Sequence, residues 1–173
     1  QLPIEDHVLA HGCSMQGVMG AGFAKELRNR FPSNYIAYRL YCVRQEAALG
    51  SHCSVVDRSQ GYPQHIVNMI TQQYYGRNPN YCYVDYAALK KSLRWACQYA
   101  EINKKPLMMP PVGLGLANGA LERIVEIYNT VCDHDVIIAT NNDALFTALK
   151  EAGKWQTKVY PSSEPKATSK TLR

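Results

Sequence analysis

Short apolar runs alternate along this chain with longer segments that carry apolar residues at helical spacing. This pattern predicts strands over residues 7–12, 52–57, 65–71, 106–110 and 135–140. It predicts helices over about 22–31, 33–48, 83–103, 119–131 and 142–152. Strands that alternate with helices favour an α/β fold around a largely parallel sheet, and such sheets bind ligands beyond the carboxyl ends of their strands.

Length and charge predict one folded domain with a polar tail. A chain of 173 residues that is 46% hydrophobic can bury a sizeable core. The net charge is +5, but residues 154–173 hold five basic residues and one acidic residue, so the rest of the chain is nearly neutral. We therefore expect a domain over 1–153, a flexible basic tail over 154–173, and no nucleic-acid-binding face on the domain.

The six cysteines are widely spaced and include no Cys-x-x-Cys pair. That spacing does not favour a metal site, and we expect neither a metal nor a cofactor. We interpret the cysteines as reduced thiols of a cytoplasmic protein, in the host cytoplasm if a phage encodes it. No basic and apolar leader and no run of roughly 18 apolar residues is visible, so we expect no membrane partner. We expect a monomer.

Three glycines within six positions, Gly17-Val-Met-Gly-Ala-Gly22, lie between the first predicted strand and the first predicted helix. Glycine lets the backbone turn with positive φ and approach a ligand closely. The N-terminus of the following helix attracts anions, so the segment indicates a phosphate site. A tight turn with close packing explains the glycines equally well.

A second glycine-rich loop, Pro110–Gly119, follows a predicted strand and precedes a helix in the same way. Two such loops at two strand ends could hold the two ends of a diphosphate or a phosphorylated ribose. The first loop reads Gly-x-x-Gly-x-Gly, which is not the dinucleotide-binding fingerprint. A module that binds another mononucleotide remains an alternative.

The order of these elements resembles the macro domain family of ADP-ribose binders. The resemblance spans roughly residues 7–140 and is carried by Val8–Ala24, Val67–Gln72 and Met109–Gly119. It is strongest to the ADP-ribose-1''-phosphate phosphatases and related ADP-ribosyl hydrolases of phages, bacteria and yeast. The resemblance implies a three-layer α/β/α sandwich with a mixed, largely parallel sheet, and ADP-ribose or ADP-ribose-1''-phosphate as the ligand.

The resemblance also implies roles for individual residues. The first loop would run beside the distal ribose, the second would bind the diphosphate, and Thr140 and Asn141 could approach the adenosine half. The expected ligand-binding residues are Ser14, Gln16, Gly17, Val18, Met19, Gly20, Ala21, Gly22, Phe23, Asn68, Thr71, Gln72, Val112, Gly113, Leu114, Gly115, Leu116, Ala117, Asn118, Gly119, Thr140 and Asn141. Polar residues that merely cap strand ends are the structural alternative.

Several positions depart from the family pattern, and they decide between an enzyme and a binder. Ser14 stands where the family usually has Asn. Gln72 stands where hydrolases that remove ADP-ribose from carboxylate side chains have Lys, and Ala117 and Ala120 stand where acidic residues occur. His11 is the remaining catalytic candidate, as a base or nucleophile on ADP-ribose-1''-phosphate, unless backbone groups simply satisfy it. The alternative is a non-catalytic reader or sponge of ADP-ribose.

The tyrosine-rich segment Tyr74–Tyr81 has the composition of a flap over the cleft. Arg77 could pair with a phosphate there, and Tyr74 or Tyr75 could stack on adenine. Packing within the loop is the alternative role for these aromatic residues.

Overall fold

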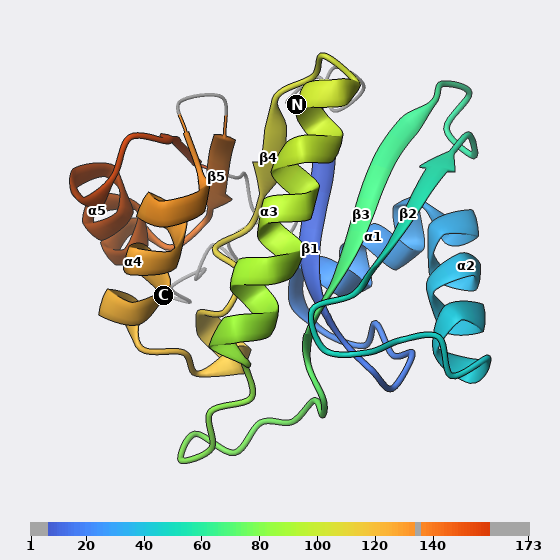
Figure 1. Ribbon diagram of the computed structural model, residues 1–173, viewed down its shortest axis with the longest axis horizontal. Helices are drawn as coiled ribbons and strands as arrows, with labels where there is room; N and C mark the ends of the chain where they lie inside the picture. The colour runs from blue at the N-terminus through green and yellow to red at the C-terminus, as the bar shows by residue number, and fades with distance from the viewer. Residues whose placement is uncertain (1–6, 134–135, 160–173) are drawn as a thin grey trace, which may run out of the picture.

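A six-stranded sheet forms the centre of the molecule (Figure 1). The computed structural model describes residues 7–133 and 136–159. The strand order is β2-β3-β1-β4-β5-β6. The strands are β1 (Val8–Ser14), β2 (His52–Asp57), β3 (Gln64–Gln72), β4 (Leu107–Met109), β5 (Val136–Thr140) and β6 (Gln156–Val159).

All strand pairs are parallel except β2 with β3, which is antiparallel. The antiparallel pair forms because β2 and β3 are joined by a short loop, whereas the parallel neighbours are joined by crossover segments that contain helices. The sheet is therefore mixed and largely parallel, as the alternation of elements predicts.

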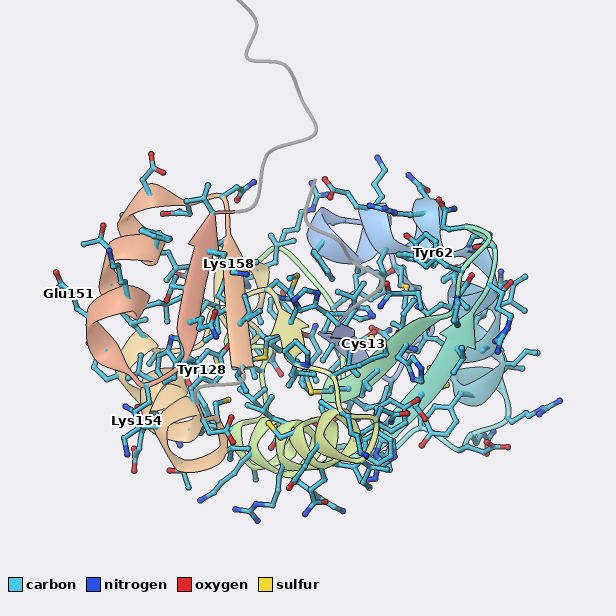
Figure 2. All side chains as sticks on the ribbon, turned by 90° about the horizontal axis from the view of Figure 1, so that it is seen from above. Cys13, Tyr62, Tyr128, Glu151, Lys154 and Lys158 are labelled. Carbon is cyan, nitrogen blue, oxygen red and sulfur yellow. The ribbon has the colours of Figure 1, made fainter. Side chains whose placement is uncertain are left out.

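Helices cover both faces of this sheet (Figure 2). They are α1 (Gly22–Arg30), α2 (Pro32–Val43), α3 (Tyr86–Ile102), α4 (Leu121–Val131) and α5 (Asp143–Ala152). Leu27 of α1 and Tyr38 of α2 are buried against one face, and Leu93, Ile124 and Leu149 belong to the cluster on the other. Alternate residues of β1 belong to the apolar clusters on opposite faces of the sheet. The prediction of a three-layer α/β/α sandwich is therefore confirmed.

The helix boundaries differ from the predictions where local geometry stops the helix. The second helix ends at Val43 rather than residue 48, because Gln45 takes a left-handed conformation with φ 58°. The third begins at Tyr86 rather than residue 83, where the Asp85 carboxylate accepts a hydrogen bond from the Ala88 N–H at 2.8 Å. A 3-10 turn at Gly115–Ala117 delays α4 to Leu121.

The folded sheet continues beyond residue 153, the expected end of the domain. Strand β6 pairs in parallel with β5, from Gln156 opposite Ile137 to Val159 opposite Thr140. Trp155 is buried against Tyr128, with the two rings edge to face and their centroids 5.6 Å apart. The rest of the predicted tail, residues 160–173, lies outside the described residues. Within the described ranges no helix is long and apolar enough to cross a membrane.

Candidate functional site

A cleft of about 870 Å³ opens across the carboxyl ends of β1, β3, β4 and β5. Its walls come from four loops, which are residues 18–24, 71–77, 110–117 and 139–142. Because β3 and β5 flank β1 and β4 in the sheet, the cleft spans three strand spacings, or about 14 Å. This is an ordinary size for a small-molecule site.

Most of the residues that the sequence predicts for the site line this cleft. They are His11, Ser14, Val18, Met19, Gly20, Ala21, Gly22, Phe23, Thr71, Gln72, Val112, Gly113, Leu114, Gly115, Leu116, Ala117, Thr140 and Asn141. Gln16, Gly17, Asn68, Asn118 and Gly119, which the sequence also predicts for the site, do not line it. These five residues support the cleft from outside, as the hydrogen bonds and packing below explain.

The first glycine loop brings the N-terminus of α1 to the cleft. Gly17 and Gly22 have φ values of 71° and 53°, which favour glycine at both turns. Gly17 is buried, and a Cβ there would lie 3.3 Å from the Cβ of Cys42. The N-cap residue of α1, Ala21, offers no side-chain cap and the first turn contains no acidic residue. The helix start can therefore receive an anion.

The second glycine loop is shaped by packing on its inner side. Gly113 has φ 92°, and a Cβ there would lie 2.5 Å from Ile124 Cδ1. Gly119 donates its N–H to the Gly113 carbonyl at 2.8 Å, and this bond closes the loop. Gly115, with φ 66°, has no atom within 4 Å of an added Cβ. The outer side of the loop is thus free to approach a ligand closely.

Asn68 is predicted at a strand end but lies in the middle of β3, fully buried and opposite His11 in the parallel register. Its Nδ2 donates to the carbonyl of Cys53 at 3.0 Å and to Asn34 Oδ1 at 2.8 Å. Those donor bonds fix the orientation of the amide, so Asn68 Oδ1 is the acceptor for His11 Nε2 at 2.7 Å. Asn68 therefore orients His11 and does not line the cleft.

His11 is a neutral imidazole whose Nε2 carries the proton. The side chain is only 2% exposed, and burial lowers its pKa to about 4 although the bond to Asn68 opposes that shift. The Sγ of Cys13 lies 3.5 Å from Nε2 and 3.7 Å from Nδ1. With Nε2 donating to Asn68, Nδ1 is the ring nitrogen that has a lone pair, and the Cys13 thiol is close enough to donate to it.

The free energy of unfolding should decrease as the pH falls, because His11 is buried as a neutral imidazole. Its pKa is about 4 when folded and near 6.5 when unfolded, so the unfolded chain binds more protons between these values. The contribution is complete above pH 6.5 and is lost as the pH falls toward 4. We expect a loss of about 2 kcal/mol between pH 7.5 and 5. Burial also lowers the pKa values of His52 and His65. These two histidines therefore add to the loss of stability in acid.

Urea unfolding at several pH values measures this effect. A His11→Gln variant removes the titrating group, so its stability should depend less on pH than that of the wild-type chain. Equal slopes for the two proteins between pH 7.5 and 5 would contradict the assignment of His11.

Residues 73–83, which we call the flap, run from the end of β3 to the start of α3 (Figure 1). Gln72 Nε2 donates to the Tyr74 carbonyl at 2.7 Å, and Gln16 Oε1 accepts from the Tyr75 N–H at 3.0 Å. Asn118 Nδ2 donates to the carbonyls of Asn78 and Tyr81, both at 2.9 Å. Gln16 and Asn118 thus serve the site by holding the flap in place.

Two charged side chains line the cleft within the described residues, Glu26 of α1 and Arg77 of the flap. The sequence predicts Arg77 and Tyr75 as flap residues, but it does not single out Glu26 or Asn142 for the cleft. Asn142 accepts a bond from the Leu145 N–H at 2.9 Å and caps α5, and an Asn before a helical segment is a recognisable signal. All six cysteines are free thiols, and no cluster of metal-ligating side chains occurs in the described ranges.

No protein-family model matches the sequence. A Mycobacterium tuberculosis protein named DNA ADP-ribosyl glycohydrolase is 31% identical over 144 residues, which cover 79% of this chain. The match covers only 39% of that relative's length.

Two solved structures share the fold. The macrodomain of Mycobacterium tuberculosis DarG superposes with a TM-score of 0.62 at 22% identity, covering 94% of this chain and 93% of that one. Thermosipho africanus DarTG in complex with ADP-ribose has a TM-score of 0.63 at 16% identity, covering 93% of this chain and 39% of that one. The sequence match and the shared fold together show that this chain belongs to the macrodomain family.

Proposed function

We propose that the cleft binds ADP-ribose. The observation that carries this proposal is that both glycine loops open onto one cleft that crosses four strand ends. A length of about 14 Å suits an extended molecule with a diphosphate at its centre. The complex of a structural relative with ADP-ribose supports the same ligand.

The diphosphate would lie between the N-terminus of α1 and the outer side of the loop Gly113–Gly119. Backbone N–H groups and the helix dipole attract its negative charge. The distal ribose would lie by the first loop and Thr71, and the adenosine half by Thr140 and Asn141, as the family resemblance implies. Arg77 can add a charge-assisted hydrogen bond to a phosphate.

Isothermal titration calorimetry tests this binding. We expect ADP-ribose to bind one molecule per chain and to bind more tightly than AMP, which lacks the distal ribose and its phosphate. The absence of heat at millimolar ADP-ribose would contradict the proposal.

Hydrolysis is the second candidate, favoured by the relatives named DNA ADP-ribosyl glycohydrolases. Its substrates would be ADP-ribosylated DNA or ADP-ribose-1''-phosphate. The acid and base groups that the family resemblance implies are incomplete in this cleft: His11 Nε2 is bonded to Asn68, and Ala117 lines the cleft where an acidic residue is expected, so that Glu26 of α1 is the carboxylate among the lining residues described. We therefore propose binding as the main function, with hydrolysis slower by orders of magnitude than in relatives with a complete catalytic set.

A gain-of-function variant tests the catalytic part. In Gln72→Lys the ammonium group can still donate to the Tyr74 carbonyl and also supplies the lysine that the family resemblance places there. We expect release of ADP-ribose from ADP-ribosylated DNA to rise by about 100-fold or more. Phosphate release from ADP-ribose-1''-phosphate is measured in parallel for the wild type and His11→Gln. Undiminished release in His11→Gln would remove His11 from any mechanism.

A further inference from the structure

We propose that Tyr128 is a positioning residue for the cleft: its buried hydroxyl holds the Val112–Gly113 peptide so that the Gly113 N–H faces a phosphate of the ligand. This inference rests on the proposed binding of ADP-ribose. Tyr128 does not line the cleft, so its role is to fix the direction of a donor without touching the ligand.

The hydroxyl of Tyr128 reaches the second glycine loop from α4. The side chain is fully buried between that helix and the sheet (Figure 2). The hydroxyl donates to the Val112 carbonyl at 2.6 Å, and Trp155 packs edge to face against the ring. Burial raises the pKa of Tyr128 well above its usual value. The hydroxyl therefore keeps its proton and remains a donor.

This bond fixes the direction of one backbone N–H in the loop. The carbonyl and the N–H of a trans peptide point to opposite sides. Because the Val112 carbonyl points toward Tyr128, the Gly113 N–H points away from α4. Val112 and Gly113 both line the cleft. We therefore infer that the Gly113 N–H is on the ligand side of the loop.

The N–H groups on either side of Gly113 are used within the loop. Val112 donates to the Pro110 carbonyl at 2.7 Å, and Leu114 donates to the Pro111 carbonyl at 3.2 Å. Across residues 7–133 and 136–159, the Gly113 N–H donates to no protein acceptor. A backbone donor of this kind beside an anion site is available to a phosphate oxygen.

Glycine at position 113 does not by itself select this direction. Gly113 has φ 92°, and glycine adopts the opposite sign of φ about as readily. Rotation of the Val112–Gly113 peptide would exchange the places of its carbonyl and its N–H. The rotated peptide would leave the buried Tyr128 hydroxyl without its acceptor, which is costly. The hydroxyl therefore selects the orientation in which the N–H faces the ligand.

Tyr38 of α2 makes the same kind of bond at the first glycine loop. It is fully buried, and its hydroxyl donates to the Ser14 carbonyl, also at 2.6 Å. The N–H of that peptide belongs to Met15 and donates to the Gln72 carbonyl at 3.1 Å. This N–H is used within the protein, so the peptide offers no donor to the ligand. Tyr38 is therefore a matched control for Tyr128.

Calorimetry with ADP-ribose and urea unfolding compare Tyr128→Phe with Tyr38→Phe. In Tyr128→Phe we expect the Val112 carbonyl to turn toward water in the cleft and present an oxygen to the phosphate. The affinity for ADP-ribose should fall at least about 10-fold. In Tyr38→Phe it should stay within about 3-fold of the wild-type value. Both variants should lose similar stability, because each loses one buried hydroxyl bond.

The NMR signal of the Gly113 amide proton is a readout that a merely structural role of Tyr128 would not change. At saturating ADP-ribose we expect this proton to shift downfield in the wild-type chain and in Tyr38→Phe, because it donates to a charged oxygen. The shift should be absent in saturated Tyr128→Phe. Trimethylamine N-oxide, which favours the folded state, keeps both variants folded during the measurements.

The outcomes separate this inference from the proposed function. If ADP-ribose binds the wild-type chain without a shift of the Gly113 proton, the inference is wrong and ADP-ribose binding stands. This result needs no variant. Equal losses of affinity in Tyr128→Phe and Tyr38→Phe, or equal shifts of the Gly113 proton in both, would also overturn the role of Tyr128. If the folded wild-type chain does not bind ADP-ribose, the proposed function itself fails.

Discussion

Replacing Gly20 with valine is expected to weaken ADP-ribose binding by about 100-fold while changing the free energy of unfolding by less than about 0.5 kcal/mol. Gly20 lines the cleft, and a Cβ there meets only Val18 Cγ1, at 3.6 Å. The backbone φ of Gly20 is not in the left-handed region, so a side chain adds no strain. The branched methyl groups would hold a phosphate away from the backbone, and the loss of one or two charge-assisted hydrogen bonds accounts for the factor.

Calorimetry with ADP-ribose and urea unfolding of the same variant measure the two quantities. Gly119→Ala is the matched control, because Gly119 does not line the cleft and its added Cβ would collide with the Gly113 carbonyl oxygen. That control should lose stability, whereas Gly20→Val should lose affinity. Wild-type affinity in Gly20→Val would exclude the first loop from the phosphate site, and loss of folding would make Gly20 a structural glycine.

The largest effect on stability is expected for Asn68→Ala, about 3–5 kcal/mol. The amide is fully buried and bonds to His11, Asn34 and Cys53 at once. Removing it leaves the His11 Nε2–H, the Asn34 side chain and the Cys53 carbonyl without this partner inside the protein. Asn34 also bonds through its backbone N–H to the buried Asp57 carboxylate, so the damage extends to the contact between α2 and β2.

Urea unfolding at pH 7.5 measures this loss. Asn141→Ala is the control, since Asn141 is the same residue type but is exposed at the cleft. It should stay within about 0.5 kcal/mol of the wild-type chain. A loss below about 1 kcal/mol in Asn68→Ala would mean that water or a rearranged Asn34 replaces the amide.

Hydrophobic periodicity predicts the layers of this fold because each helix buries one face and each central strand buries both. The runs that become β1, β3 and β5 are apolar on both faces, which is typical of strands covered by helices on each side. Strand β6 escapes prediction because Gln156, Thr157 and Lys158 are polar, and the strand forms at the edge of the sheet through its backbone bonds to β5. The β-strand propensities of individual residues carry little information about such an edge strand.

The cleft could be predicted from its two glycine loops, but its supports could not. Asn68 looks like a polar residue at a strand end in the sequence, and only the register with β1 places it beneath His11. Gln16 and Asn118 act on main-chain groups 59 and 37–40 residues away, and no local pattern encodes such partners. Long-range side-chain bonds to backbone are the part of this site that requires the tertiary structure.

The way in which the flap is held has a consequence for the divergence of this family. Gln16, Gln72 and Asn118 bind peptide groups of the flap, and any residue except proline at position 75 presents the same groups. The side chains at positions 74, 75 and 77 can therefore be exchanged without loosening the loop. Selection can change what the cleft accepts beside the flap one side chain at a time, with the two glycine loops and the fold left as they are.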